Sequence, residues 1–584
     1  MEISIHKSYA GQSLFFTGLT GFVGKVFLFK VLKEFPDIKN IYCLIRTKKG
    51  QAPLDRFKQV LASECFSPLR KELGEEAFNA RVAKVIPVAG DMMEDQLGLN
   101  DADYQVLVDD VNYIIHMAAT VDFQEKLNIS VKMNVLGMLR VLSLARKCRN
   151  LQSFVHTSTC YVNWNRMSGE VPVKEQVYPL PFDPEEMCKY ILALHDHHVP
   201  GETKALLAKY RFPNTYTFTK SIAEQLLLKV KGNIPVSIVR PAIIGCSWKE
   251  PMPGWIDVLT AAGAIILTAG LGILKDLHAN ANYVADLVPV DYVCSTLIKC
   301  SVKTAVAHRV RAASGGLADG SISITEVLAP YANAIPNFDT VRISGVVPVP
   351  RNRMIEVKQD GKGAPSFSSS SPAEIADAKS NASSATATRL SNFSLEKSCK
   401  ELPFVFQSCT SGSQNRLRWQ TMVDSISRLW GGAIRHPKAV SEIGTKLVNT
   451  RAEYLFRLWV YRKIPFLMMK AAVSMPPPIG SPSKQKLLVR YEKALRRTEM
   501  LNFQFMPFTM NQWLYENNHS QQYLDPGLDE RSAEAFATDV YDLSWWTYCE
   551  LYSWGMTKFI MKSDVREQPQ MPLTGAKAFL KASL

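Results

Sequence analysis

Near its N-terminus the chain reads Ser13-Leu-Phe-Phe-Thr17, then Gly18-Leu-Thr-Gly21-Phe-Val-Gly24, then Lys25-Val-Phe-Leu-Phe-Lys-Val-Leu-Lys33. An apolar run, three glycines spaced three apart and a segment with helical periodicity predict a strand–turn–helix unit. The glycines permit a tight turn, admit a pyrophosphate against the backbone and let helix and strand pack closely. A purely structural turn is the alternative, but the context favours a dinucleotide site. The residues assigned to it are Thr17, Gly18, Thr20, Gly21, Phe22, Val23 and Gly24.

A basic loop follows the second predicted strand, at residues 41–45, and reads Arg46-Thr-Lys48-Lys49. An acidic residue at this position would bind the 2′-hydroxyl of NAD. A basic one suits the 2′-phosphate of NADP, with Arg46 as the guanidinium partner, so the sequence predicts NADPH. Three exposed loop charges are the alternative interpretation.

Two more predicted strands, at residues 82–88 and 113–119, end in residues that suit a cofactor site. Asp91 follows the first and could accept from an adenine amino group or cap its own turn. Ala118 and Ala119 end the second, where small side chains leave room for a cofactor. Asn134 begins a predicted helix beneath the site. Its amide could position a water or a lysine, or could satisfy buried backbone.

A tyrosine and a lysine lie four residues apart in Pro213-Asn-Thr-Tyr216-Thr-Phe-Thr-Lys220, at the start of a predicted helix. Both side chains share one helical face. A neighbouring ammonium lowers the pKa of a phenol, which would make Tyr216 a proton donor near neutrality. A predicted strand at residues 152–161 ends in the hydroxyls of Ser158 and Thr159, either of which could hold a substrate carbonyl. By itself such a pair is usually a solvated helix face.

A sixth predicted strand, at residues 236–245, carries Pro241-Ala242-Ile243, which is expected to lie against a nicotinamide. The apolar, glycine-containing segment after it, residues 254–292, could bind a hydrophobic substrate. Within it residues 258–274 form the most apolar run, interpreted as core or pocket wall. We expect no membrane-spanning helix and no secretory signal.

The composition bounds the class of protein. The chain has 584 residues, of which 47% are hydrophobic and 21% charged, which indicates a multidomain globular protein. Its net charge of +14 suits an anionic partner, such as cofactor phosphates or an acidic membrane surface, and a solvated basic surface is the alternative. No RNP, zinc-finger or basic-zipper pattern supports nucleic acid. The eleven cysteines lack a C-x-x-C pair, so neither a disulfide framework nor a metal site is indicated.

The expected fold is α/β, a Rossmann-type doubly wound parallel sheet followed by a mainly helical C-terminal domain. The first domain is placed at 1–357, a Ser-rich disordered linker at 358–400, the helical domain at 401–570 and a tail at 571–584. In the helical domain, residues 454–470 mix aromatics with cations, as interfacial membrane helices do, although a core helix fits nearly as well. A basic stripe at 484–497 could meet lipid headgroups or coenzyme A phosphates, or be a solvated face.

These motifs, in this order, resemble the extended short-chain dehydrogenase/reductase superfamily and, more narrowly, the alcohol-forming fatty acyl-CoA reductases. The likeness covers nearly the whole chain except the Ser-rich segment. The matching phrases are Thr17-Gly-Leu-Thr-Gly-Phe-Val-Gly24, Ile115-His-Met-Ala-Ala-Thr-Val-Asp-Phe123, His156-Thr-Ser-Thr-Cys-Tyr-Val-Asn163, Pro213 to Lys220, Arg240-Pro-Ala-Ile-Ile-Gly245, Val284-Ala-Asp-Leu-Val-Pro-Val-Asp291, Phe508-Thr-Met-Asn-Gln-Trp513 and Asp539-Val-Tyr-Asp-Leu-Ser-Trp545.

The resemblance implies reduction of a long-chain acyl-CoA to a primary alcohol with two NADPH, through a thiohemiacetal that expels coenzyme A and a bound aldehyde. It assigns the carbonyl contact to Thr159 or Ser158 and the proton to Tyr216. Lys220 would lower the pKa of Tyr216 and bind the nicotinamide ribose. Tyr216 and Lys220 thus belong to the catalytic and the cofactor-binding sets.

Two other functions stay open: another reductase of this superfamily, acting on a steroid or nucleotide sugar, and a non-catalytic NADPH- or lipid-binding scaffold. The resemblance also implies peripheral contact with a membrane, at the cytosolic face of the endoplasmic reticulum or, alternatively, at the peroxisome. The sequence does not determine the preferred chain length, the release of aldehyde, the oligomeric state or the role of the Ser-rich segment.

Overall fold

The structure is a computed structural model. It describes residues 2–48, 50–166, 172–259, 261–313, 404–413, 415–431, 436, 438–475, 482–541, 543–563 and 567–571. The predicted linker at 358–400 lies outside these residues, as does nearly all of the predicted tail.

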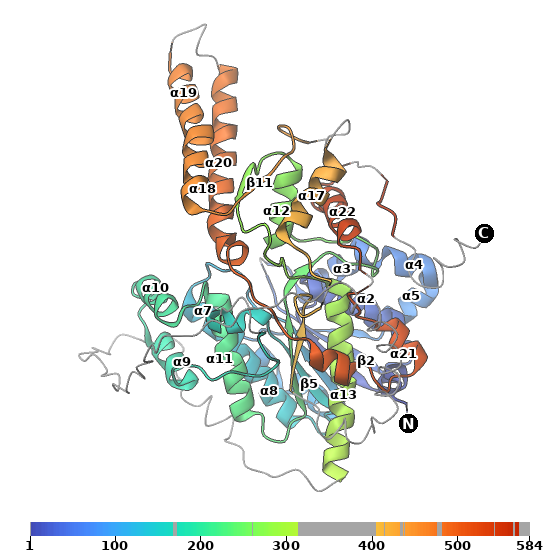
Figure 1. The fold of residues 1–584 in the computed structure, drawn as a ribbon. Coiled ribbons are helices and arrows are strands. Elements are labelled where there is room, and N and C mark those ends of the chain that lie inside the picture. The colour runs from blue at the N-terminus through green and yellow to red at the C-terminus, as the bar shows by residue number, and fades with distance from the viewer. Residues whose placement is uncertain are drawn as a thin grey trace, which may run out of the picture.

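A seven-stranded sheet, parallel throughout, lies at the centre of the protein (Figure 1), in the order β10-β6-β5-β4-β1-β2-β3. In the register, Leu14 pairs with Ile41 on one side and with Tyr113 on the other. The order reverses beside β1, which places a crevice at the carboxyl ends of β1 and β4. The strands are β1 (Ser13–Thr17), β2 (Asn40–Ile45), β3 (Val85–Ala89), β4 (Tyr113–His116), β5 (Ser153–Thr157), β6 (Val236–Pro241) and β10 (Val405–Ser408).

Helices form a layer on each side of this sheet, which confirms the predicted doubly wound fold. On one side α2 (Phe22–Glu34) packs against α13 (Val290–Ala313), and on the other α8 (Gly137–Lys147) contacts α6 (Asp101–Asp110) and α11 (Thr215–Val230). Every residue of β1 is buried, as expected for a central parallel strand covered on both faces. The other helices of this half are α1 (Ile5–Tyr9), α3 (Pro53–Leu61), α4 (Ser67–Leu73), α5 (Glu75–Val82), α7 (Leu127–Val131), α9 (Pro184–Ala193), α10 (Val199–Tyr210) and α12 (Ala261–Gly270).

Several predicted strands are shorter in the structure. The strand expected at 82–88 begins at Val85 because α5 continues to Val82. The strands expected to reach 119 and 161 end at His116 and Thr157. The residues beyond these ends form loops at the carboxyl edge of the sheet.

One helix, Leu127–Lys147, is long and apolar enough to cross a membrane by length and composition, whereas the sequence predicted none. It consists of α7, a π-helical turn (Lys132–Leu136) and α8. In its most apolar 18-residue stretch, 72% is buried inside the protein, and the helix contacts β4 and α11. It is therefore a helix that packs on the central sheet.

The C-terminal part is largely helical, as predicted, but it is joined to the first half more closely than the predicted boundary at 401 implies. β10 extends the central sheet beside β6, and β11 (Lys446–Val448) pairs with β8 (Asp276–His278). A second small sheet joins β7 (Ile243–Gly245) to β9 (Leu287–Pro289). The helices of this part are α17 (Trp419–Trp430), α18 (Arg451–Leu458), α19 (Ile464–Val473), α20 (Pro482–Thr509), α21 (Glu530–Ala535) and α22 (Trp545–Gly555).

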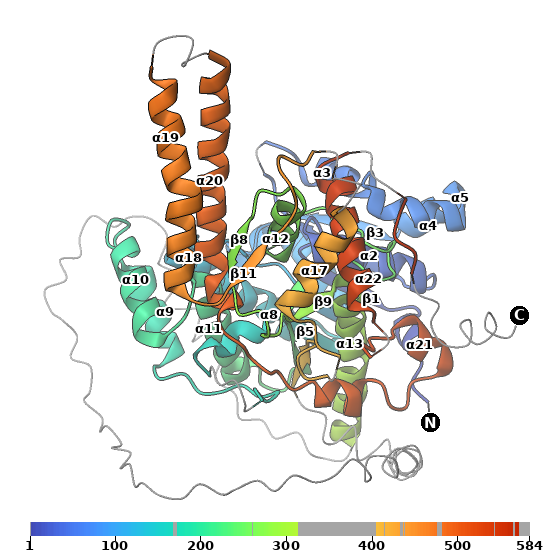
Figure 2. The same ribbon diagram turned by 45° about the horizontal axis from the view of Figure 1, so that its top comes forward.

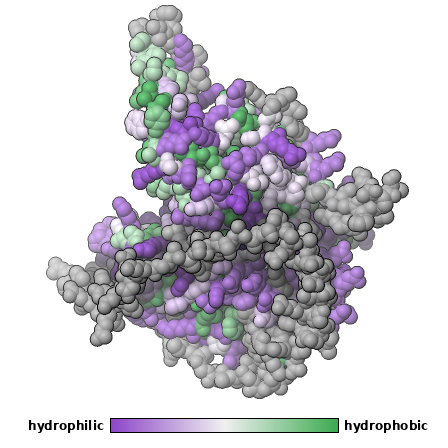
Figure 3. All heavy atoms as spheres, in the orientation of Figure 1, coloured by the Kyte–Doolittle hydropathy of each residue, from purple (hydrophilic) through white to green (hydrophobic). Residues whose placement is uncertain are grey.

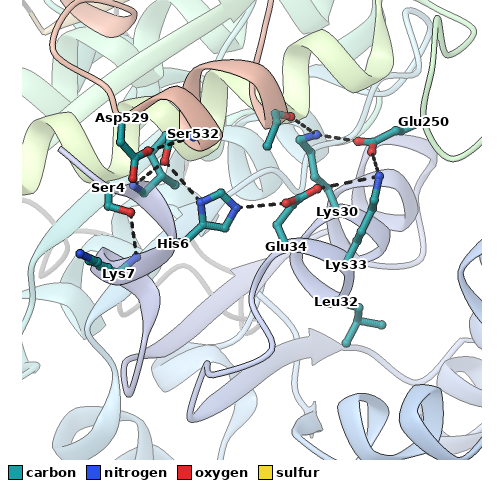
Figure 4. Close-up of polar contacts among 12 residues, drawn as sticks. Ser4, His6, Lys7, Lys30, Leu32, Lys33, Glu34, Glu250, Asp529 and Ser532 are labelled. Atoms are coloured by element: carbon teal, nitrogen blue, oxygen red, sulfur yellow. Dashed lines mark hydrogen bonds and ion pairs between the residues drawn. The ribbon is translucent and has the colours of Figure 1, made fainter. Parts of the chain in front are cut away.

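A network of hydrogen bonds and ion pairs connects the N-terminal helices α1 and α2 to α21 of the C-terminal part (Figure 4). The ring of His6 in α1 lies 3.1 Å from a Glu34 carboxylate oxygen and 3.3 Å from the Ser532 hydroxyl of α21. Lys30 donates to Glu250 at 2.6 Å and to the Ala535 carbonyl. α1, α2 and α21 are thereby held as one body.

Candidate active site

A cavity of about 960 Å³ opens at the carboxyl edge of the sheet, where the fold predicts a ligand. Its walls come from the glycine turn, from the ends of β1, β4, β5 and β6, and from helices of the C-terminal part. Of the predicted site residues, all but Asn134 line it: Thr17, Gly18, Thr20, Gly21, Phe22, Val23, Gly24, Arg46, Asp91, Ala118, Ala119, Ser158, Thr159, Tyr216, Lys220, Pro241, Ala242 and Ile243.

The glycine turn has the geometry that its spacing predicts. Gly18 has φ +92°, and a Cβ there would lie 3.1 Å from the Ala118 nitrogen. A Cβ on Gly24 would lie 2.2 Å from the Gly18 carbonyl oxygen, so a side chain cannot fit between helix and turn. α2 begins after Gly21 without a side-chain cap, so its first N–H groups are free to bind an anion. This cradle fits the pyrophosphate of a dinucleotide.

Positive charge gathers at the end of β2. Arg46 and Lys48 line the cavity, and the Arg46 guanidinium lies 3.8 Å from the Asp91 carboxylate. Arg56 of α3 joins them: it donates to the Arg46 carbonyl at 2.6 Å and to the Thr20 hydroxyl at 3.0 Å. Burial, followed by the charge of Arg46, holds the pKa of Arg56 below its usual value. Sequence reasoning missed Arg56, ten residues beyond Arg46.

Asp91 makes the local contact that was one of its two predicted roles. One carboxylate oxygen accepts from the Met93 N–H at 3.0 Å and caps the turn, while the other faces Arg46. Its second predicted role, toward an adenine, stays a prediction.

The predicted hydroxyl, phenol and ammonium groups come together on the cavity wall. Asn214 caps α11 by accepting from the Thr217 N–H at 2.9 Å, which fixes Tyr216 and Lys220 on the first turns of the helix. The Lys220 ammonium donates to the Thr157 carbonyl at 2.7 Å, and the Tyr216 phenol hydrogen-bonds with Thr159.

The two candidate hydroxyls differ in their surroundings. Thr159 Oγ1 donates to the Pro241 carbonyl at 3.4 Å and also contacts Tyr216. Ser158 Oγ is buried without a hydrogen-bond partner among the described residues. Either hydroxyl could accept a new contact, so the choice between them stays open.

The expected effect of the lysine on the tyrosine is not present in this structure. Burial raises the pKa of Tyr216 above its usual value, and the hydrogen bond with Thr159 only partly opposes it. Burial lowers the pKa of Lys220 to about 8. The prediction that Lys220 lowers the phenol pKa was therefore wrong for this structure, because both groups are shielded from water.

Asn134 does not reach the cavity lining, which corrects its assignment to the cofactor site. It lies in the π-helical turn rather than at a helix start. Its amide oxygen accepts from the Thr120 N–H at 2.9 Å and its nitrogen donates to Thr219 at 3.0 Å. Asn134 thus ties the loop after β4 to α11, which is the buried-backbone role that the sequence left open.

The far side of the cavity is apolar and aromatic. Phe123 lies between Tyr216, at 6.2 Å, and Phe508, at 5.9 Å between ring centroids. The segment 258–274 contributes wall residues as predicted, whereas Trp419 and Phe505 were not predicted. The apolar lining includes Val121, Phe123, Ile129, Met133, Val258, Leu259, Ala262, Ile265, Trp419, Phe505 and Phe508.

Among the described residues, no cluster of three or more His, Cys, Asp or Glu side chains could hold a metal ion. His116 is fully buried in the core, and burial lowers its pKa to about 3. It is therefore neutral at physiological pH.

Comparison with known proteins agrees with this geometry. The sequence pattern of the family described as Male sterility protein matches residues 16–297. Fatty acyl-CoA reductase 1 of Xenopus laevis is 27% identical over 569 residues, which cover 97% of this chain and 88% of that protein. The human protein of that name is 28% identical over the same length. The chain is therefore similar to fatty acyl-CoA reductases along nearly its whole length. It is an NAD(P)H-dependent oxidoreductase.

Fatty acyl-CoA reductase 2 of Bos taurus is 35% identical over 301 residues, which cover 52% of this chain and 56% of that protein. Among solved structures, the chain is similar to the terminal R domain from the myxalamid PKS-NRPS biosynthetic pathway. The identity is 15%, the TM-score is 0.48, and the likeness covers 96% of this chain and 93% of that one.

Proposed function

We propose that the protein reduces a long-chain acyl-CoA to the primary alcohol with two NADPH, through a thiohemiacetal that expels coenzyme A and an aldehyde that stays bound. One observation carries the proposal. The glycine cradle, the Thr159–Tyr216–Lys220 cluster and an aromatic wall meet in a single cavity. The names of the relatives support the acyl-CoA substrate.

The chain's own residues suit the proton chemistry of such a reduction. The phenol of Tyr216 carries its proton at neutral pH and can donate it to a carbonyl oxygen, although burial raises its pKa and so makes it a weaker acid than an exposed tyrosine. Thr159 or Ser158 would hold that oxygen, and Lys220, fixed on the Thr157 carbonyl, would bind the nicotinamide ribose. The glycine turn, Ala118 and Pro241 would hold the nicotinamide cofactor, which would supply the hydride.

The aromatic wall favours an acyl chain over a nucleotide sugar. Phe123 and Phe508 stack 5.9 Å apart beside Tyr216 and offer no hydrogen-bonding group to sugar hydroxyls. Incubation with NADPH and acyl-CoAs of graded length, followed by gas chromatography, is expected to yield fatty alcohol. Oxidation of NADPH with a sugar nucleotide, and none with any acyl-CoA, would reject the proposal.

The basic cluster at the end of β2 supports NADPH rather than NADH. Arg46, Lys48 and Arg56 line the cavity, and guanidinium groups match a phosphate. Replacing Arg46 or Arg56 with Ala is expected to weaken NADPH binding about 10- to 100-fold, because each loses a charge-assisted hydrogen bond. NADH affinity should stay unchanged. Titration calorimetry measures both.

The matched control is Arg149→Ala, which removes an exposed arginine outside the cavity and should change neither affinity. Equal losses of NADPH and NADH affinity in the Arg46 or Arg56 variant would show that these arginines do not contact the 2′-phosphate.

A further inference from the structure

A helical hairpin projects from the body of the protein. α18, a π-helical turn (Trp459–Lys463) and α19 form the outgoing arm, and α20 returns beside it (Figures 1 and 2). The two arms contact each other along α19 and α20, where Phe466 stacks on Tyr491 at 6.0 Å. Beyond its base the hairpin stands clear of the rest of the fold in both views.

The outgoing arm buries almost none of its apolar residues. No residue of α18 or the π-helical turn is buried, and in α19 only Val473 is. Figure 3 shows hydrophobic side chains gathered along the hairpin. Such a continuous exposed surface marks an interaction site. The large exposed apolar residues of the hairpin are Leu455, Phe456, Trp459, Tyr461, Ile464, Leu467, Met468, Met475, Val489, Met500 and Phe503.

The hairpin also carries much of the protein's positive charge. Residues 451–509 contain eleven lysines and arginines against three glutamates, a net charge of +8 out of the chain's +14. Some cations near the base are neutralised: Arg457 pairs with Asp276 and Lys463 with Glu499. Six have no acidic partner among the ion pairs of the described residues: Arg451, Lys470, Lys486, Arg490, Lys493 and Arg497.

Exposed apolar side chains together with unpaired cations indicate which kind of partner the hairpin binds. An apolar stripe with Trp459 and Tyr461 among cations matches a helix lying in the interface of an anionic bilayer. A second copy of the chain would bring two surfaces of net charge +8 together, which is unfavourable. An apolar groove on an unrelated protein would leave the lysines and arginines without counter-charges.

We propose that the hairpin is a docking arm that lays its apolar face into the surface of an anionic phospholipid bilayer without spanning it. The base of α20 supplies Gln504, Phe505 and Phe508 to the cavity wall. Because α20 belongs both to the hairpin and to the cavity wall, docking of the hairpin would bring the apolar end of the cavity close to the lipid. That second step, delivery of an acyl chain from the membrane, rests on the proposed function, whereas the docking itself does not.

The test uses the full chain and vesicles of phosphatidylcholine with phosphatidylserine, scored by co-sedimentation without substrate. The triple variant Trp459→Glu, Leu467→Glu and Met468→Glu is expected to lower the membrane partition coefficient at least about tenfold. These residues lie outside the cavity, so turnover of monomeric acyl-CoA should stay unchanged. The control carries Val106→Glu, Tyr190→Glu and Val440→Glu, exposed apolar residues elsewhere, and should bind like the wild type.

A second variant tests the charge. Lys486→Glu, Arg490→Glu and Lys493→Glu should abolish the preference for phosphatidylserine over pure phosphatidylcholine vesicles, and salt should weaken wild-type binding. Vesicle binding by both hairpin variants equal to wild type would overturn the proposal. So would a hairpin-dependent dimer in sedimentation velocity with no vesicle binding. Because vesicle binding is measured without substrate, a failure of binding leaves the proposed reaction untouched.

Discussion

Replacing Tyr216 with Phe is expected to lower the rate of acyl-CoA reduction by about 10²- to 10⁴-fold, the usual contribution of a positioned proton donor. The phenol is the acidic O–H group that α11 presents beside Thr159 and Lys220 on the cavity wall. Phe preserves the ring and its packing against Phe123, at 6.2 Å, so the loss is chemical rather than structural. Stopped-flow oxidation of NADPH measures the rate, and a fluorescence titration measures cofactor affinity.

The cofactor affinity of Tyr216→Phe should stay close to that of the wild type. Tyr190→Phe, at an exposed tyrosine of α9, is the matched control and should be fully active. Wild-type turnover by the Tyr216 variant would remove this residue from the proton-donating role.

The second large effect concerns stability. Arg240 is fully buried and is held by two hydrogen bonds from its guanidinium to the carboxylate of Glu224 in α11, one of 2.9 Å and one of 2.5 Å. Burial alone would lower the pKa of Arg240, but the Glu224 carboxylate raises it above its usual value. Glu224→Ala leaves this cation buried without its partner and should lower the free energy of unfolding by about 3–5 kcal/mol. Urea denaturation followed by circular dichroism measures it.

The control is Glu186→Ala, which removes an exposed carboxylate paired with Lys189 at 2.9 Å and should cost less than about 1 kcal/mol. The double variant Glu224→Leu with Arg240→Met replaces the pair by apolar side chains and should recover part of the loss. A Glu224→Ala protein as stable as the control would show that the pair does not hold the end of β6.

Local patterns predicted the parts of the site that a short stretch of chain builds by itself. Gly18, Gly21 and Gly24 determine the turn through their own spacing, and Tyr216 and Lys220 share a face because four residues make about one helical turn. The ends of β1, β4, β5 and β6 meet because parallel strands all place their carboxyl ends at one edge of the sheet. These features need no knowledge of distant contacts.

The features that sequence reasoning missed depend on residues far apart in the chain. Arg56 contacts Thr20, which lies 36 residues earlier in the chain, and Trp419 and Phe505 close the cavity from the C-terminal part. β10 extends the sheet beside β6 although more than 160 residues separate them. No local periodicity signals such pairings. The raised pKa of Tyr216 has the same origin, because burial comes from packing that spacing does not reveal.

The most direct test of the central claim supplies palmitoyl-CoA with NADPH that carries deuterium at both C4 positions of the nicotinamide. Mass spectrometry then locates the label. Two successive hydride transfers predict a primary alcohol with two deuterium atoms on C1, together with free coenzyme A. An unlabelled product, or cofactor binding with no reduction of any acyl-CoA, would contradict the account.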